Sequence, residues 1–426
     1  MATSAAPFTS PLAASLAPGL LERFERYVRI DTEARRGERE RSPSSPGQLD
    51  LARLLVDELR DLGLDDAEVD DNGYVMATLP ATVEDTPVVG LIAHVDTSPD
   101  APGAGVEPIV HRAYDGGRIE LPRGGTVLDP ESMPELLDAV GHDIVTSSGD
   151  TLLGADDKAG VAEIMSAVAH LAANPDLPRP TLRIGFTVDE EIGLGASLFD
   201  VERFGARCAY TIDGSSLGEL QDETFSGIGA TIEIEGHDVH PGFATGKLVN
   251  AARIAGRVLA ALPQDRLTPE TTSGRDGFIH VYEVQGTAAR ATIHAIVRDF
   301  DDELLQGHVE LLRRTAEEVV ATEPRARLRF EAKAQYPNMR RFLQDDPEIV
   351  AAAERALRAE GIDPVRRPIR GGTDGSLLSS MGLPTPNLFT GGHEYHSVRE
   401  WASLQEMAAS AATIVRLAGE WAVTAR

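Results

Sequence analysis

Four segments of this chain share one pattern, a run of apolar residues that ends in an acidic residue or a histidine. The residues at these ends are His94 with Asp96, Asp156, Glu190 with Glu191, and Asp213. Stretches of helical periodicity separate the runs, and strands that alternate with helices favour a mainly parallel sheet. Ligands of such sheets bind beyond the carboxyl ends of the strands. The pattern therefore predicts an α/β fold whose acids gather along one edge.

Residues 184–195 contain the most acidic of these ends. They alternate apolar with smaller or polar residues, as a strand does, and then run into Asp189, Glu190 and Glu191. Three adjacent carboxylates repel one another. A bound cation would remove that repulsion, and a carboxylate left off the metal could act as a base. Taken alone, the triplet is more typical of a solvated acidic loop, so its interpretation depends on the other strand ends.

Two further positions have competing interpretations. Asp156 and Asp157 open a predicted helix at 159–173; a helix N-cap needs one acid, so the pair leaves one carboxylate over. His393 and His396 both follow a short predicted strand at 386–389, and either could reach the acidic edge. A lone histidine of this kind is more often a packed or surface residue than a ligand.

The middle of the chain departs from the alternation. Strands are predicted at 229–235, 278–284, 291–300 and 326–332, with helices at 247–261 and 301–321. The order β-α-β-β-α-β is that of a ferredoxin-like sandwich. We therefore predict an inserted domain at 225–333 within a catalytic domain of 17–224 and 334–426. Residues 1–16, rich in alanine and serine, are predicted to be a disordered lead-in.

Composition narrows the classes of partner. The chain has 40 Lys and Arg against 68 Asp and Glu, a net charge of −28, which disfavours nucleic acid and anionic membranes. Its one cysteine, Cys208, excludes an intrachain disulfide and a cysteine-based zinc site. No apolar run approaches the ~18 residues of a membrane span. We expect a cytoplasmic protein. Residues 103–146, rich in Gly and Pro, are a long insertion to which the sequence assigns no role.

Together and in this order, the motifs resemble those of the dinuclear zinc metallopeptidases, the family of peptidase T and carboxypeptidase G. The motifs are H-V-D-T-S-P-D, G-A-D-D-K-A-G, T-V-D-E-E-I-G, I-D-G, H-P-G, V-R-D-F-D, G-G-T-D-G-S and Y-H-S. The first two and V-R-D-F-D indicate the peptidase T branch, that of tripeptide aminopeptidases. The resemblance implies a mainly parallel-sheet catalytic domain with an inserted ferredoxin-like lid domain, through which two copies form a homodimer.

The resemblance also implies the site residues. One zinc ion would be held by His94, Asp156 and Asp213, and a second by Asp156, Glu191 and His396, with Co²⁺ or Mn²⁺ as alternatives. Asp96 would orient His94, and Glu190 would be the general base. His240, Asn250 and Arg298 would contact the substrate. A cis peptide bond is implied after Asp156.

The implied reaction is release of the N-terminal residue from tripeptides by hydroxide held between the two zinc ions. Short peptides are thus the expected substrates, with His240 in the partner subunit's site. His237 competes with His240 for that role, and Arg298 alone would also fit a surface ion pair with Asp299 or Asp301. The alternative function is an amidase or carboxypeptidase of the same family that acts on N-acyl amino acids.

Overall fold

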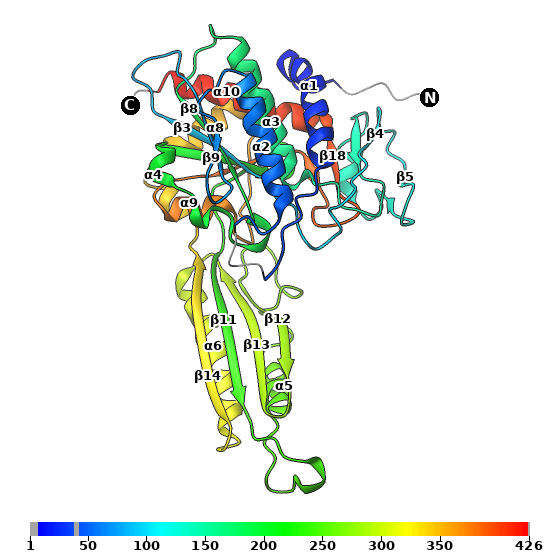
Figure 1. The fold of residues 1–426 in the computed structure, drawn as a ribbon, viewed down its shortest axis with the longest axis vertical. Coiled ribbons are helices and arrows are strands. Elements are labelled where there is room, and N and C mark those ends of the chain that lie inside the picture. Colours follow the sequence, from blue (N-terminus) through cyan, green and yellow to red (C-terminus); the bar gives the residue numbers. More distant parts are fainter. Residues whose placement is uncertain (1–6, 38–41, 425–426) are drawn as a thin grey trace. The chain divides into compact units, whose positions relative to one another are not determined.

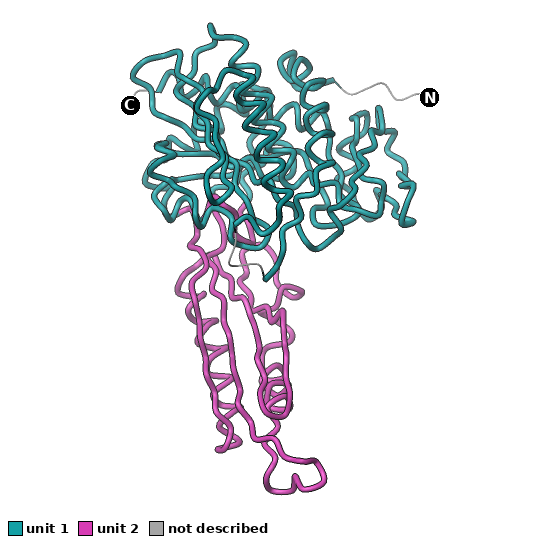
Figure 2. Tube along the Cα trace, viewed as in Figure 1, with its two compact units in different colours: residues 1–222, 341–367, 377–426 teal, residues 223–340, 368–376 magenta. Residues whose placement is uncertain are grey.

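The computed structural model describes residues 7–37 and 42–424, which form two compact units (Figure 2). Unit 1 comprises residues 1–222, 341–367 and 377–426, and unit 2 comprises 223–340 and 368–376. None of the helices in the described residues combines the length and apolar character of a membrane span.

Unit 1 is built on an eight-stranded sheet (Figure 1). Its strands, in spatial order, are β1 (Glu68–Val69), β2 (Val75–Leu79), β8 (Leu182–Thr187), β3 (Val89–His94), β9 (Cys208–Gly214), β16 (Asn387–Phe389), β10 (Glu219–Gln221) and β15 (Val365–Arg366). β3 is parallel to β8 and β9, and β9 is parallel to β16. The predicted parallel sheet is therefore confirmed at its centre, while β1, β2 and β10 add antiparallel pairs.

Five helices of unit 1 pack on this sheet or on one another. α3 (Ala155–Ala173) contacts β3 and β9, and α1 (Pro11–Val28) and α10 (Leu404–Ala422) pack against α3. α8 (Glu348–Ala359) packs on α10, and α2 (Pro46–Asp61) on β1 and β2. α3 and α10 are buried over nearly their whole length, because α3 lies between the sheet and the helices α1 and α10, and α10 packs against α1, α3 and α8.

The predicted lead-in of 1–16 is wrong for its second part. Residues 1–6 lie outside the described residues, but α1 begins at Pro11. The Ser10 side chain accepts a hydrogen bond from the Ala13 N–H, and proline is favoured at the first helical position. Leu16 and Leu20 are buried. The alanine- and serine-rich composition therefore conceals a capped amphipathic helix.

Residues 103–146 form small sheets with the C-terminal segment. β4 (Ile109–His111) pairs with β7 (Ile144–Thr146), β7 with β18 (Trp401–Ser403), and β18 with β17 (Gly392–His393). β5 (Ile119–Glu120) and β6 (Val127–Leu128) form a separate pair. Trp401 is buried in a core otherwise made of residues from the insertion. The insertion and the C-terminal segment that contains His396 therefore share one small sheet and one core.

Unit 2 has the predicted β-α-β-β-α-β order. Its elements are β11 (Ser226–Glu235), α5 (Ala251–Ala261), β12 (Phe278–Gly286), β13 (Arg290–Asp299), α6 (Asp302–Ala321) and β14 (Arg327–Tyr336). The antiparallel sheet has the order β12-β13-β11-β14, and both helices pack on it. Alternate residues such as Ile232, Ile293 and Val297 are buried under the helices, which gives the period-two pattern visible in the sequence.

Unit 2 is larger than the predicted domain of 225–333. The N–H of Asn338 donates to Ser226 Oγ, so the chain after β14 stays with unit 2. Residues 368–376 also belong to it, because the Phe225 N–H donates to the Ile369 carbonyl oxygen and Ser376 Oγ bonds Thr224 Oγ1. These bonds join segments distant in sequence, which periodicity cannot reveal.

Candidate metal centre and active site

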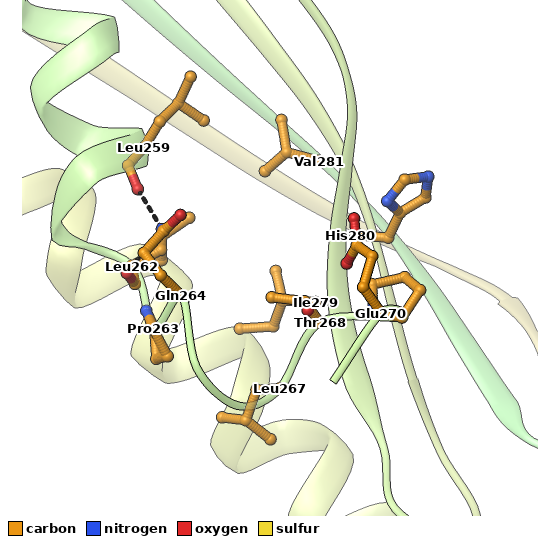
Figure 3. Close-up of a pocket in the computed structure, with 11 residues that line it drawn as sticks. Leu259, Leu262, Pro263, Gln264, Leu267, Thr268, Glu270, Ile279, His280 and Val281 are labelled. Atoms are coloured by element: carbon orange, nitrogen blue, oxygen red, sulfur yellow. Dashed lines mark hydrogen bonds between the residues drawn. The ribbon is translucent and has the colours of Figure 1, made fainter. Parts of the chain in front are cut away.

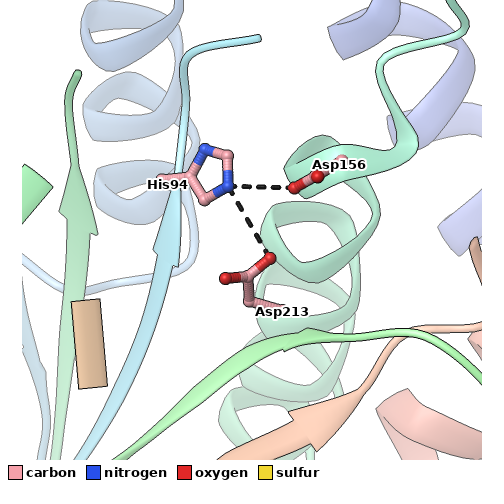
Figure 4. Close-up of side chains that lie close together, drawn as sticks. All are labelled: His94, Asp156 and Asp213. Atoms are coloured by element: carbon pink, nitrogen blue, oxygen red, sulfur yellow. Dashed lines mark hydrogen bonds and ion pairs between the residues drawn. The ribbon is translucent and has the colours of Figure 1, made fainter. Parts of the chain in front are cut away.

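His94 lies at the end of a fully buried central strand, β3, and is 2% exposed. Its Nε2 atom lies 3.0 Å from Asp156 Oδ1 and 3.7 Å from Asp213 Oδ1 (Figure 4). Its Nδ1 atom lies 3.1 Å from the Asp96 carbonyl oxygen and 3.3 Å from Asp96 Oδ1. Asp96 is thus placed to fix the ring, leaving Nε2 for the acids on the other side.

Asp156 lies between two histidines that are distant in sequence, His94 and His396. It opens α3, has non-helical backbone angles, and precedes a cis peptide bond, as the resemblance implied. Its Oδ2 atom lies 3.2 Å from Nε2 of His396, while Oδ1 faces His94. Nε2 of His396 also lies 3.0 Å from Glu191 Oε2. The Asp156 carboxylate therefore contacts both histidines and joins the acids around each of them into one cluster.

These side chains form two groups of three. Ligand atoms of His94, Asp156 and Asp213 lie within 4.8 Å of one another, and so do those of Asp156, Glu191 and His396. Imidazole nitrogens and carboxylate oxygens are the donors that zinc, cobalt and manganese accept. Glu191 Oε1 is buried and has no hydrogen-bond partner among the described residues. The donor set and this unpartnered oxygen both fit a pair of cations that shares Asp156.

The electrostatics of the cluster point the same way. Burial and the nearby charge of Asp156 together raise the pKa of Glu191 to about 8, although the hydrogen bond from His396 acts in the opposite direction. Burial would lower the pKa of His94, but hydrogen bonds to Asp156, Asp213 and Asp96 outweigh it and the pKa is raised well above its usual value. The negative charge of the carboxylates therefore favours the protonated form of the histidines. A bound metal cation would compensate the same negative charge instead.

Two carboxylates shape the loop that carries Glu190 and Glu191. Asp96 Oδ1 and Oδ2 accept hydrogen bonds from the N–H groups of Glu190 and Glu191, at 3.0 and 3.1 Å. Asp189 has a positive φ of 58°, and its carboxylate accepts bonds from Ser44 and Gln48. Of the three consecutive acids, Asp189 is therefore buried in a structural contact. Glu190 is only partly buried.

The three predicted substrate residues all belong to unit 2. His240 is exposed and accepts a hydrogen bond from the Gly242 N–H, and Asn250 caps α5 through the Arg253 N–H. The Arg298 guanidinium lies over the Tyr336 ring at 4.7 Å and donates to Gln335 Oε1 at 2.8 Å. No carboxylate pairs with Arg298 in the described part of the chain, so the surface ion pair with Asp299 or Asp301 is not formed.

Unit 2 also contains a pocket of about 170 Å³ between α5, the following loop and β12 (Figure 3). Leu259, Leu262 and Ile279 provide apolar walls, and Glu270 and His280 provide polar groups. None of the predicted substrate residues lines this pocket.

Comparison with known proteins decides the family. The model of peptidase family M20/M25/M40 matches residues 153–420. The chain belongs to this family. Proteins named peptidase T from Bacillus subtilis and Vibrio parahaemolyticus are each 46% identical to it over 94% of the chain, covering 98% and 97% of their own lengths.

Solved structures of M20 peptidases share the fold. The aminopeptidase PepT from Bacillus cereus is 25% identical, has a TM-score of 0.73, and is matched over 95% of this chain and 99% of its own. A dinuclear metal-binding M20 peptidase from Bacillus subtilis, 18% identical and matched over 95% of this chain and 98% of its own, has a TM-score of 0.62 and supports the fold alone.

In this M20 peptidase, the structure also separates residues that the sequence left open. His393 is buried, lies 3.1 Å from Glu406 and stacks on Trp401, whereas His396 lies in the cluster. Asp157 accepts hydrogen bonds from the N–H groups of His94 and Gly160, so it fixes the end of β3 as well as capping α3.

The segment before Asp156 does not form the strand that its apolar residues predict. Residues 151–154 are not a strand of the large sheet. The N–H groups of Leu153 and Gly154 donate instead to the side chain of Glu400, a contact across more than two hundred residues that no local pattern announces.

Proposed function

We propose that this M20 peptidase is a metal-dependent aminopeptidase that releases the N-terminal residue from tripeptides. The observation that carries the proposal is the pair of ligand groups that share Asp156, beside the partly buried Glu190. The 46% identity to proteins named peptidase T supports the substrate class.

His94, Asp156 and Asp213 would hold one ion, and Asp156, Glu191 and His396 the other. We propose zinc, with cobalt and manganese as alternatives that suit the same donors. Such ions would polarise the scissile carbonyl group and would lower the pKa of a bound water toward ~7.

The side chains around the centre divide the remaining work. Glu190 takes a proton from the attacking water and delivers it to the leaving amine. Asp96 keeps Glu190 in place through its backbone N–H and keeps the His94 ring oriented. Arg298, which has no acid partner in unit 2, pairs with the C-terminal carboxylate of the peptide. His240 and Asn250 contact the substrate, His240 from the partner subunit of a cytoplasmic homodimer.

A substrate panel tests the proposal. Protein stripped with a chelator and then reloaded with Zn²⁺ should hydrolyse tripeptides from the N-terminus and refuse N-acetylated tripeptides. Turnover of the N-acetylated compounds in preference to free tripeptides would support the amidase alternative instead. Light scattering at assay concentration should give the mass of a dimer, and a monomer that is fully active would contradict the shared site.

A further inference from the structure

Glu400 is a buried acid that neither the sequence motifs nor the proposed mechanism uses. It is 1% exposed. Its Oε2 atom accepts hydrogen bonds from the N–H groups of Leu153 and Gly154, both at 2.8 Å, and its Oε1 atom accepts one from the Asp156 N–H at 3.0 Å. No Lys, Arg or His side chain forms an ion pair with it among the described residues, so its hydrogen-bond partners are backbone N–H groups, and Lys158 acts on it only as a more distant charge.

The loop that Glu400 binds needs such a partner. Gly154 has a positive φ of 81°, and Asp156 has non-helical angles, so residues 153–156 belong to neither a strand nor a regular helix. Buried N–H groups outside regular structure must find another acceptor or lose free energy. A carboxylate that accepts several N–H groups makes stronger bonds than a neutral acceptor. Glu400 thereby fixes the backbone from which the Asp156 carboxylate projects.

We propose that Glu400 is a positioning residue that sets the bridging carboxylate of Asp156 for metal binding, which rests on the metal centre of the proposed function. Asp96 offers a parallel in the same cluster. Its two oxygens accept the N–H groups of Glu190 and Glu191, as those of Glu400 accept the N–H groups around Asp156. Each of the two loops with consecutive acids is therefore held by one buried acid from elsewhere in the chain.

The same inference gives the insertion a role. Glu400 immediately precedes β18, which pairs with β7 of the insertion, and Trp401 is buried in the insertion's core. The chain after β7 leads through residues 147–152 into the loop bound by Glu400. His396, Glu400 and the Asp156 loop are thus tied to one small sheet. The insertion fixes the distance between a histidine and a carboxylate of the proposed centre.

Replacement of Glu400 by glutamine tests this role. The amide keeps one oxygen acceptor, but its NH₂ group faces at least one of three N–H donors, so at least one bond is lost and the loop must shift. Changes in groups that orient metal ligands typically weaken metal affinity about 10- to 100-fold. We expect Glu400→Gln to weaken binding of at least one Zn²⁺ ion by that factor.

The measurement is a Zn²⁺ titration of the chelator-stripped full-length protein against a competing chromophoric chelator. Glu360→Gln is the matched control, because Glu360 is also 1% exposed but bonds Thr9 and Arg416 instead. Thermal unfolding in chelator reports the general loss of stability in both variants. Only Glu400→Gln should change the Zn²⁺ affinity, and it should not weaken binding further when Asp156 is already alanine.

The outcomes separate the two proposals. Wild-type protein that fails to bind two Zn²⁺ ions would overturn the proposed centre. Wild-type binding with an unchanged affinity in Glu400→Gln would overturn the role of Glu400 alone. If Glu400→Gln does not fold without metal, Glu400→Asp replaces it: the shorter side chain keeps the charge but falls short of the three N–H groups, so the same loss is expected and an unchanged affinity refutes the proposal.

Discussion

Replacement of Arg298 by methionine should remove the recognition of a free C-terminus. The guanidinium is held by stacking on Tyr336 and by Gln335, and no acid in the described part of unit 2 neutralises it. Gly227 lies opposite Arg298 in the sheet, and a Cβ there would lie 1.8 Å from Nη1, so glycine leaves room for the guanidinium. Burial lowers the pKa of Arg298, but an arginine stays charged in proteins. The structure therefore holds a cation ready for an external anion.

The size of the effect follows from the burial of this cation. Loss of one partner of a hydrogen-bonded charge pair costs about 2–5 kcal/mol. Arg298 is only partly buried, which places the loss near the lower end, about 2–3 kcal/mol. At 1.36 kcal/mol per factor of ten, kcat/KM for a tripeptide should fall roughly 30- to 150-fold. A tripeptide with an amidated C-terminus offers no anion, so its kcat/KM should change little.

The assay compares both substrates in the wild type, Arg298→Met and a control, Arg290→Met. Arg290 starts the same strand but is exposed and lies 3.4 Å from Glu233, so its replacement should affect neither substrate. An equal loss on the free and amidated tripeptides would mean that Arg298 supports the fold rather than the carboxylate. An unchanged kcat/KM on both substrates would show that Arg298 does not bind the substrate.

Three further changes test other parts of the structure. Glu190→Gln should lower kcat about 10²- to 10⁴-fold, as loss of a general base does, with Zn²⁺ stoichiometry unchanged; undiminished turnover refutes its role. Burial raises the pKa of Glu163 well above its usual value despite its bond from Ser410, so the folded state keeps a proton that the unfolded chain releases, and stability falls as pH rises above the unfolded value. Glu163→Gln removes this pH dependence, so its free energy of unfolding relative to wild type should increase from pH 5 to pH 8, by up to about 1.4 kcal/mol per pH unit, and its relative Tm should rise with it; a difference in Tm that does not change with pH contradicts this prediction. Gly372→Ala would place a Cβ 2.2 Å from the Tyr336 ring, whereas Gly371→Ala meets only a side-chain carbon at 3.9 Å, so only the first should lower Tm and tripeptide turnover, by about 1–3 kcal/mol of stability.

Much of the sheet can be predicted from the sequence, because the residues of each strand themselves indicate that strand. β3 and β9 are short runs of buried apolar residues that end at His94 and just beyond Asp213, and the ends of parallel strands meet at one edge. The order of elements in unit 2 follows from period-two and helical patterns for the same reason. The start of α1 at Pro11 is not evident from composition, because the alanine- and serine-rich segment is helical only in combination with the cap at Ser10.

The residues around His393 and His396 do not show which of the two histidines lies among the acids. Both follow the same strand, and only the contacts of His393 with Glu406 and Trp401 remove it from the cluster. Resemblance to known metallopeptidases indicated His396, whereas the residues themselves left both open. The boundary of unit 2 near Arg340 likewise depends on bonds between distant segments.

The acids around the centre serve two different kinds of positive group. A loop that follows a strand and the start of a helix leave backbone N–H groups without partners in regular structure, and a cationic side chain cannot accept their hydrogen bonds. A carboxylate can, and it adds no positive charge to compete with a metal ion. Asp96 and Glu400 accept such N–H groups, and Asp96 also lies 3.3 Å from Nδ1 of His94, whereas Asp156 and Glu191 face the Nε2 atoms of the histidines. A count of acids near the strand ends therefore overestimates the ligands, because half of these four carboxylates bind the backbone that places the other half.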